Sequence, residues 1–229
     1  MIETTAPPSA VNWRRVITFI AITYAIDWGA IGVMRLAGIP FKGPAAVIAA
    51  VLYMLVPALV AFILMRAWGV SAPEYGVEVP RRWELLLAPL APIVIAVVGV
   101  GAAVLLGFGD FDPSGLPMID RLAALGQEDI ARRAAEQLDE LPINPVVLAL
   151  LVAPLAGFTI NGLLAFGEEL GWRGLLQQEL APLGFARASA LIGAIWGLWH
   201  APLILLGHNF PDHPRLGVFV MIAACIVRR

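Results

Sequence analysis

Cysteine and charge are both scarce in this sequence, and each scarcity excludes a class of protein. The single cysteine, Cys225, excludes an internal disulfide and a metal site built from cysteines. Charged residues make up only 14% of the chain, whereas soluble domains carry about 25%. The formal net charge is −2 and there is no basic run, so we expect no nucleic-acid partner.

Apolar residues, by contrast, are abundant. They make up 60% of the 229 residues, compared with about 45–50% in an ordinary soluble domain. A water-soluble fold of this size could not hide so much apolar surface, so lipid must form part of its solvent. The composition therefore predicts an all-α protein, a polytopic bundle of transmembrane helices that has the lipid bilayer as a partner.

Five apolar runs are each long enough to cross a bilayer, which takes about 20 residues of helix. They cover residues 16–34, 43–65, 85–109, 145–167 and 188–207. A sixth run, residues 216–227, is too short to span, so we expect five full spans and a partial sixth. Because this run stops abruptly at Arg228 and Arg229, we expect the chain to be truncated within the sixth span.

We expect residues 1–229 to form a single membrane domain. It begins with a short tail, residues 1–15, and includes one long extramembrane segment, residues 110–144. Within that segment, residues 118–141 carry apolar side chains at helical spacing and charged side chains on the other faces, which predicts an amphipathic helix or helix pair. The distribution of arginine and lysine over the loops favours a cytoplasmic N-terminus.

Two adjacent carboxylates, Glu168 and Glu169, directly follow the fourth apolar run. Ionisable groups at membrane depth are costly and are usually functional or paired. Glu169 and Arg173 are four residues apart, so they share a helix face and can form an ion pair. Glu168 lies about 100° further around the helix and can face a cavity. The alternative is that these charges only mark the point where the helix leaves the bilayer.

The fifth apolar run contains Trp196 and His200, which share a helix face, and Pro202 follows two residues later. Proline leaves one backbone carbonyl without its partner, and such a carbonyl in a membrane protein lines a cavity or finds another donor. The two segments are consecutive and antiparallel, so Glu168 and His200 could converge on one water molecule or metal ion. Alternatively, His200 is a hydrogen-bonded interior residue.

Two strings, FGEELGWRGLLQQEL at residues 166–180 and IGAIWGLWHAPL at residues 192–203, resemble the CPBP family of intramembrane peptidases. That family includes type II CAAX prenyl endopeptidases and bacterial bacteriocin-processing and immunity proteins. Its first motif, Glu-Glu-x-x-x-Arg, is matched by Glu168, Glu169 and Arg173. Its second motif, an aromatic-x-x-x-His, is matched by Trp196 and His200, with tryptophan in place of the usual phenylalanine.

The resemblance implies an all-helical fold with a catalytic chamber and a protease that cleaves a membrane-associated peptide, either prenylated or leader-bearing, in the bacterial plasma membrane. By analogy, Glu168 and His200 activate the attacking water, while Glu169 and Arg173 support the site and Trp196 contacts substrate. Both zinc, with Glu168 and His200 as ligands, and a metal-free glutamate mechanism are consistent with the family.

The third motif of the family is His-x-x-x-Asn or His-x-x-x-Asp, and His208 and Asp212 match it in form. Pro211 lies between them and predicts a loop, so we expect the true motif to lie beyond Arg229. An incomplete set of motifs would favour a second function, a non-catalytic membrane scaffold or bacteriocin self-immunity protein with the same fold.

A third function is a small-solute transporter in which Asp27, Glu168 and His200 relay protons. Such a transporter would be expected to contain an internal repeat, and the sequence shows none. For Asp27 itself, within the first apolar run, the simpler interpretation is a polar contact with another helix.

Overall fold

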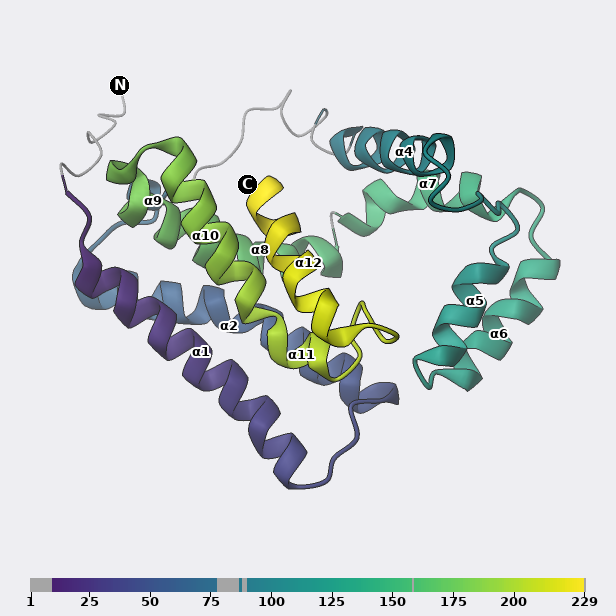
Figure 1. Ribbon diagram of the computed structural model, residues 1–229, viewed down its shortest axis with the longest axis horizontal. Helices are drawn as coiled ribbons and strands as arrows, with labels where there is room; N and C mark the ends of the chain where they lie inside the picture. The colour runs from purple at the N-terminus through teal and green to yellow at the C-terminus, as the bar shows by residue number, and fades with distance from the viewer. Residues whose placement is uncertain (1–9, 78–86, 88–89, 158, 229) are drawn as a thin grey trace. The chain divides into compact units, whose positions relative to one another are not determined.

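The computed structural model describes residues 10–77, 87, 90–157 and 159–228, and every regular element in these ranges is a helix (Figure 1). The chain divides into two compact units. The first unit comprises Met1–Phe41, Ala45–Glu78 and Leu164–Arg229, and the second comprises Lys42–Pro44 and Val79–Leu163. The all-helical prediction is confirmed for the part of the chain that the structure describes, whereas the single domain stays a prediction.

Two helices of the first unit are long and apolar enough to cross a membrane. They are α1, Trp13–Leu36, and α2, Gly43–Trp68. The N-terminus of α1 is capped by Asn12, whose side chain accepts a hydrogen bond from the backbone N–H of Arg15 at 3.3 Å. Both helices bury one face and expose large apolar side chains on the other, as helices in contact with lipid do.

The segment with the two glutamates is one continuous helical path with a change of pitch. It runs through α8, Ile160–Glu169, the π-helix η2, Leu170–Leu176, and the short α9, Gln177–Leu180. Gly171 allows this path to lie against α1 and α2, since a Cβ atom there would come within 2.7 Å of Pro57 and 2.9 Å of Phe19. Single π-helical turns within α-helices occur frequently at functional sites.

The next helices bring the histidine to the same unit. A 3₁₀ turn, η3, spans Ala181–Leu183 and leads into α10, Phe185–Trp199, followed by α11, Ala201–Leu205, and α12, Pro214–Val227. The helix α12 lies along α10 because Gly193 and Gly197 have no side chain, and a Cβ on Gly197 would be 2.4 Å from the Cα of Ile222. Figure 1 shows the two helices in green and yellow.

The second unit contains α4, Leu90–Leu105, α5, Leu116–Ala124, α6, Glu128–Asp139, and α7, Pro145–Gly157. The helices α5 and α6 pack against each other across a turn at Gly126, whose φ is +73°. Two helices thus occupy the predicted amphipathic segment, residues 118–141, and its location outside the membrane stays a prediction.

The count of five full spans is not confirmed. The run 145–167 is divided between α7 and α8, and the run 188–207 is divided between α10 and α11 because Pro202 cannot donate the hydrogen bond that would continue the helix. The helix α4 covers 16 residues of the run 85–109, and residues 85, 86, 88 and 89 lie outside the described part of the chain. So do residues 1–9 of the predicted tail.

Candidate active site

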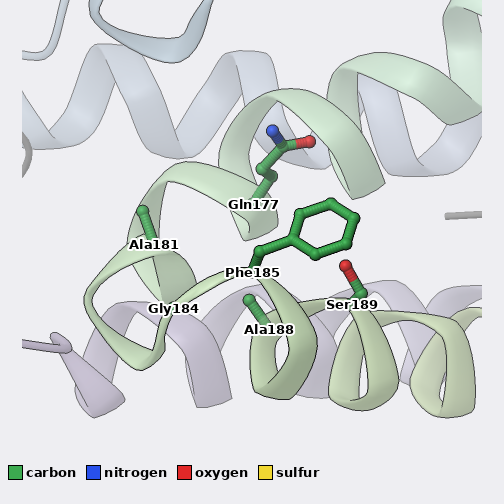
Figure 2. A pocket seen from close by; sticks show the side chains of 6 residues that line it. All are labelled: Gln177, Ala181, Gly184, Phe185, Ala188 and Ser189. Carbon is green, nitrogen blue, oxygen red and sulfur yellow. The ribbon is translucent and has the colours of Figure 1, made fainter.

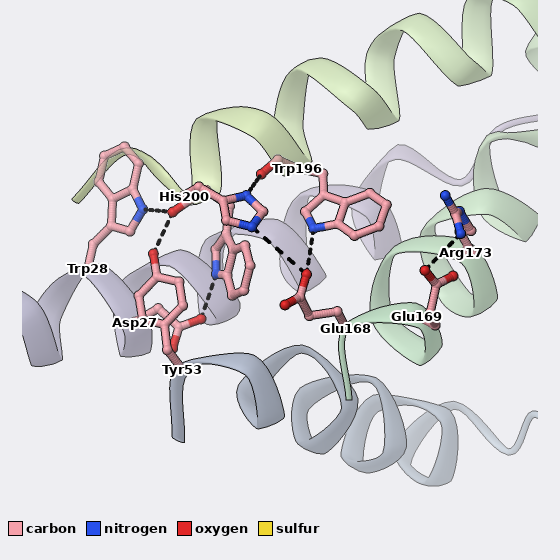
Figure 3. A network of polar contacts seen from close by, with 9 residues as sticks. Asp27, Trp28, Tyr53, Glu168, Glu169, Arg173, Trp196 and His200 are labelled. Atoms are coloured by element: carbon pink, nitrogen blue, oxygen red, sulfur yellow. Dashed lines mark hydrogen bonds and ion pairs between the residues drawn. The ribbon is translucent and has the colours of Figure 1, made fainter. Parts of the chain in front are cut away.

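Glu168, at the end of α8, faces the last turn of α10. Its Oε2 atom accepts a hydrogen bond from the indole Nε1 of Trp196 at 3.0 Å and lies 3.9 Å from Nε2 of His200 (Figure 3). The side chains of Glu168 and His200 are only 13% and 15% exposed. The predicted convergence of these two residues is thus observed, at a distance too long for a direct hydrogen bond.

The contact that His200 makes at its other nitrogen determines what the ring can do. Its Nδ1 atom lies 2.9 Å from the backbone carbonyl oxygen of Trp196. A carbonyl can only accept, so Nδ1 must carry a proton, and in the neutral ring Nε2 is then an acceptor. An acceptor nitrogen and a carboxylate oxygen 3.9 Å apart can both bond to one water molecule.

Glu169 and Arg173 form the ion pair that their spacing predicts. The Nη1 atom of Arg173 lies 2.8 Å from Oε1 of Glu169, and its Nη2 atom donates to the carbonyl of Arg228 at 3.2 Å. The guanidinium carbon of Arg173 also lies 5.2 Å from the ring centre of Trp196, within the range of a cation–π contact. The pair therefore supports the indole that binds Glu168.

Trp196 makes two contacts that its motif alone did not predict. The indole N–H is bonded to Glu168, and the ring is stacked at 6.3 Å from the ring of Trp172. The contact with substrate stays a prediction. A phenylalanine, usual at this position in the resembling family, would pack similarly but could not donate to the carboxylate.

Asp27 makes the contact with another helix that the sequence suggested. It is 1% exposed, and its Oδ2 atom accepts a hydrogen bond from the indole Nε1 of Trp199 at 2.6 Å. The hydrogen bonds of three aromatic donors on α1 and α2 were not predicted from the sequence. Tyr24 donates to the carbonyl of Ile195, and Trp28 and Tyr53 both donate to the carbonyl of Trp199. Their signal was the polar atom that each carries within an apolar helix.

A second polar cluster was missed entirely. Glu179 on α9 is 4% exposed, and its Oε1 atom accepts from Nη1 of Arg15 at 3.0 Å and from the hydroxyl of Tyr75. Arg15 also lies 5.0 Å above the ring of Trp68. Tyr75 belongs to the 3₁₀ turn η1, Pro73–Tyr75, between the predicted spans, where burial and then the bond to Glu179 raise the pKa of its hydroxyl.

The two residues that match the third motif in form do not lie on a helix. His208 and Asp212 fall between α11 and α12, and Asn209 between them has a left-handed backbone with φ of 62°. The prediction of a loop here is confirmed. This segment therefore does not present the two side chains on one helical face, as the family's His-x-x-x-Asp spacing would.

The donor set for a metal is small. Within the described ranges, no group of three or more histidine, cysteine, aspartate or glutamate side chains is placed to hold a metal ion. Glu168 and His200 supply two donors, whereas a catalytic zinc takes three protein ligands and a water. The residues present do not fit a zinc site of that kind.

A cavity of about 180 Å³ lies between α9, η3 and α10, apart from these polar groups (Figure 2). It is lined by Gln177, Ala181, Gly184, Phe185, Ala188 and Ser189. None of the predicted site residues borders it.

Comparison with known families gives a match over the C-terminal part of the chain. The family model described as type II CAAX prenyl endopeptidase Rce1-like matches residues 142–228. We refer to residues 142–228, which are similar to this family, as the Rce1-like region. The match confirms the resemblance that the motifs indicated. No curated protein matches the chain significantly, and neither does any solved structure.

The Rce1-like region contains all five predicted site residues, Glu168, Glu169, Arg173, Trp196 and His200. The helices that hold its second motif from the other side, α1 and α2, precede it in the sequence. The Rce1-like region thus carries the predicted site residues, and the N-terminal helices contribute donors and a carboxylate to their surroundings.

Proposed function

We propose that this protein is an intramembrane endopeptidase of the CAAX type that hydrolyses a peptide bond with a water molecule activated by Glu168 and His200. The observation that carries this proposal is the 3.9 Å separation of Glu168 Oε2 and His200 Nε2 in a nearly buried position within the Rce1-like region. A general base must reach the proton that it removes, directly or through one water, and both groups meet that condition here.

The chemistry follows from the two free acceptors. Glu168 takes one proton from the water as its oxygen forms a bond to the carbonyl carbon of the peptide. His200 Nε2 accepts a hydrogen bond from the other water proton and orients the attack. As the tetrahedral intermediate collapses, the C–N bond breaks, and the proton held by Glu168 passes to the leaving amine. No covalent intermediate with the protein forms.

The remaining motif residues act on Glu168 indirectly. The indole N–H of Trp196 holds one carboxylate oxygen, and Arg173, paired with Glu169, supports the indole ring. Such fixed geometry matters because general-base catalysis depends on the angle and distance to the water. We propose no metal in this reaction, since the described residues offer two donors only.

The substrate we propose is a membrane-associated peptide, prenylated or leader-bearing, and the location we propose is the bacterial plasma membrane with a cytoplasmic N-terminus. The Rce1-like match supports a peptide substrate at a membrane, and the arginines of the short loops support the orientation. The two membrane-length helices, α1 and α2, support an integral membrane protein.

The test compares Glu168→Gln with the matched control Glu140→Gln, an exposed glutamate at the end of α6. The full chain, in proteoliposomes, is given a panel of fluorescence-quenched peptides with and without a prenyl group. We expect Glu168→Gln to lower the cleavage rate by roughly 10²-fold or more and the control to leave it unchanged. A chelator should have no effect, and inhibition by chelator that added zinc reverses would refute the metal-free mechanism.

A second function, a non-catalytic membrane scaffold or self-immunity protein, is favoured by one observation. His208 and Asp212, the residues that match the third motif in form, lie in a loop and are not displayed on a helix. If no peptide in the panel is cleaved and Glu168→Gln retains the cellular role of the protein, the scaffold function replaces the protease.

A further inference from the structure

Residue 199, which directly precedes the histidine, is held by three polar contacts from α1 and α2. Its indole Nε1 donates to Oδ2 of Asp27 at 2.6 Å. Its backbone carbonyl accepts from the indole of Trp28 at 3.2 Å and from the hydroxyl of Tyr53. Figure 3 shows these contacts on the side of His200 opposite to Arg173. Both the side chain and the main chain of Trp199 are therefore fixed by the N-terminal helices.

Trp199 directly precedes His200 in the chain, so contacts that fix Trp199 also restrict the position of His200. The helix α10 ends at Trp199, His200 forms the junction, and α11 begins at Ala201. At this junction the backbone N–H of His200 bonds to the carbonyl of Leu198, outside the regular helical pattern, while the carbonyl of His200 still accepts from the N–H of Ile204 at 3.1 Å. The rings of Trp199 and His200 lie edge to face with their centres 4.7 Å apart. Fixing Trp199 therefore limits how the imidazole beside it can rotate.

A buried aspartate is an unfavourable residue for a contact that only packs one helix against another. An acidic side chain in an apolar helix carries a large desolvation cost, and Asp27 is 1% exposed. A charge-assisted hydrogen bond is shorter and stronger than a neutral one, in keeping with the 2.6 Å distance. One helical turn earlier on the same face, Thr23 is fully buried, and its hydroxyl has no hydrogen-bond partner among the residues that the structure describes. The bond of Asp27 is therefore not a general consequence of burial on this face.

We infer that Asp27 is a positioning residue for His200. Its carboxylate holds the indole of Trp199, and Trp199 in turn keeps the imidazole oriented with Nδ1–H toward the carbonyl of Trp196 and Nε2 toward Glu168. The effect on catalysis rests on the proposed function, whereas the effect on the histidine tautomer does not.

The first test reads the histidine directly. The full chain contains three histidines, so ¹⁵N-histidine labelling in detergent micelles and the variants His208→Gln and His213→Gln assign the signal of His200. We expect the Nδ1–H tautomer in the unaltered chain and in Asp27→Asn, whose amide oxygen can still accept from the indole. We expect Asp27→Leu to lose that single tautomer and show a mixture, since the indole of Trp199 then loses its acceptor while only its backbone carbonyl stays bonded.

Two further variants keep the test decisive. Trp199→Phe removes the donor and retains Asp27, so it should change the His200 signal in the same way even if Asp27→Leu does not fold. Thr23→Val is the matched control on the same buried face and should leave the tautomer unchanged. If His200 keeps the Nδ1–H tautomer in both Asp27→Leu and Trp199→Phe, the inference is wrong.

The second test uses the peptidase assay. A misplaced catalytic group can cost roughly 10²-fold in rate, so Asp27→Leu should lower kcat by about that factor and leave KM nearly unchanged. The double variant Asp27→Leu with Trp199→Phe should be no slower than the slower single variant, because both remove the same bond. Additive losses would overturn the inference. Loss of the tautomer without any cleavage activity in the unaltered chain would refute the proposed function and keep the positioning role.

Discussion

Glu168 and Glu179 lie on the same helical path and show two different roles of a buried carboxylate. Glu179, on α9, accepts from both an arginine and a tyrosine, so its charge is neutralised and its oxygen is occupied. Glu168, at the end of α8, has a single neutral donor and a histidine at 3.9 Å. The first arrangement links η1, α1 and α9. The second arrangement leaves a carboxylate that can still accept a proton. Such a carboxylate can act as a base in a reaction, but it adds little to the stability of the fold.

The largest effect should separate activity from stability at Glu168. Besides the loss of cleavage described above, we expect Glu168→Gln to unfold at the same temperature as the unaltered chain or a higher one. The amide oxygen can still accept from Trp196, and a buried charge without a counter-ion is removed. Thermal unfolding in detergent, followed by tryptophan fluorescence, checks this. A marked fall in the unfolding temperature would mean that Glu168 is as structural as Glu179.

Glu179→Gln, in contrast, should lower the stability of the fold. It leaves Arg15 without its counter-charge, and we expect the free energy of unfolding to fall by about 1–3 kcal/mol. This is less than for a fully buried pair because the arginine side chain is 31% exposed. Cleavage by the folded fraction should be retained. The control is Glu136→Gln, which breaks the exposed pair with Arg132 and should cost less than about 0.5 kcal/mol. Equal losses in the two variants would contradict the structural role of Glu179.

The donor to Glu168 can be removed alone. Trp196→Phe keeps an aromatic ring between Arg173 and the core but loses the indole N–H. A hydrogen bond to a charged group contributes about 1.5–3 kcal/mol, so we expect kcat to fall by roughly tenfold or more while KM changes little. Steady-state kinetics with a cleaved peptide test this. A rise in KM with constant kcat would instead support the predicted contact between Trp196 and substrate.

The smallest effect concerns pH at the Glu179 cluster. The pKa of Tyr75 is raised above its ordinary value of about 10 by burial and by Glu179. The resulting stabilisation is complete below about pH 10 and is lost as pH rises through the folded-state pKa. Unfolding temperatures of the unaltered chain and of Tyr75→Phe, measured from neutral to strongly alkaline pH, should differ by a constant amount up to pH 10 and converge above it. A constant difference throughout would show that this tyrosine titrates normally.

Contacts within one turn of helix were predictable from the sequence. The α-helical period predicts that Glu169 and Arg173, four residues apart, share a face, and they pair at 2.8 Å even though α8 gives way to the π-helix η2 between them. The convergence of Glu168 and His200 was also predictable, since their helices are consecutive and a short connection makes them antiparallel neighbours. The motifs predicted which residues take part in the chemistry, and the helical period predicted which of them lie close together.

Contacts between distant segments were not predictable in this way. Asp27 lies 172 residues from Trp199, and Arg15 lies 164 residues from Glu179. Many polar atoms could have satisfied each of these buried groups, and the one that does so depends on how the helices pack. Hydropathy also failed to show that the runs 145–167 and 188–207 are each divided between two helices, because it counts apolar residues and not backbone hydrogen bonds.

The sequence by itself determined that the chain is helical, apolar enough for a membrane and equipped with a glutamate, a histidine and an ion pair in a peptidase-like order. Only the tertiary structure decided which buried carboxylate is neutralised and which keeps a free oxygen. Helical periodicity relates residues a few positions apart, so it can be read from the local sequence. The partners of a buried charge come from the helices that pack against it, so they depend on the whole fold.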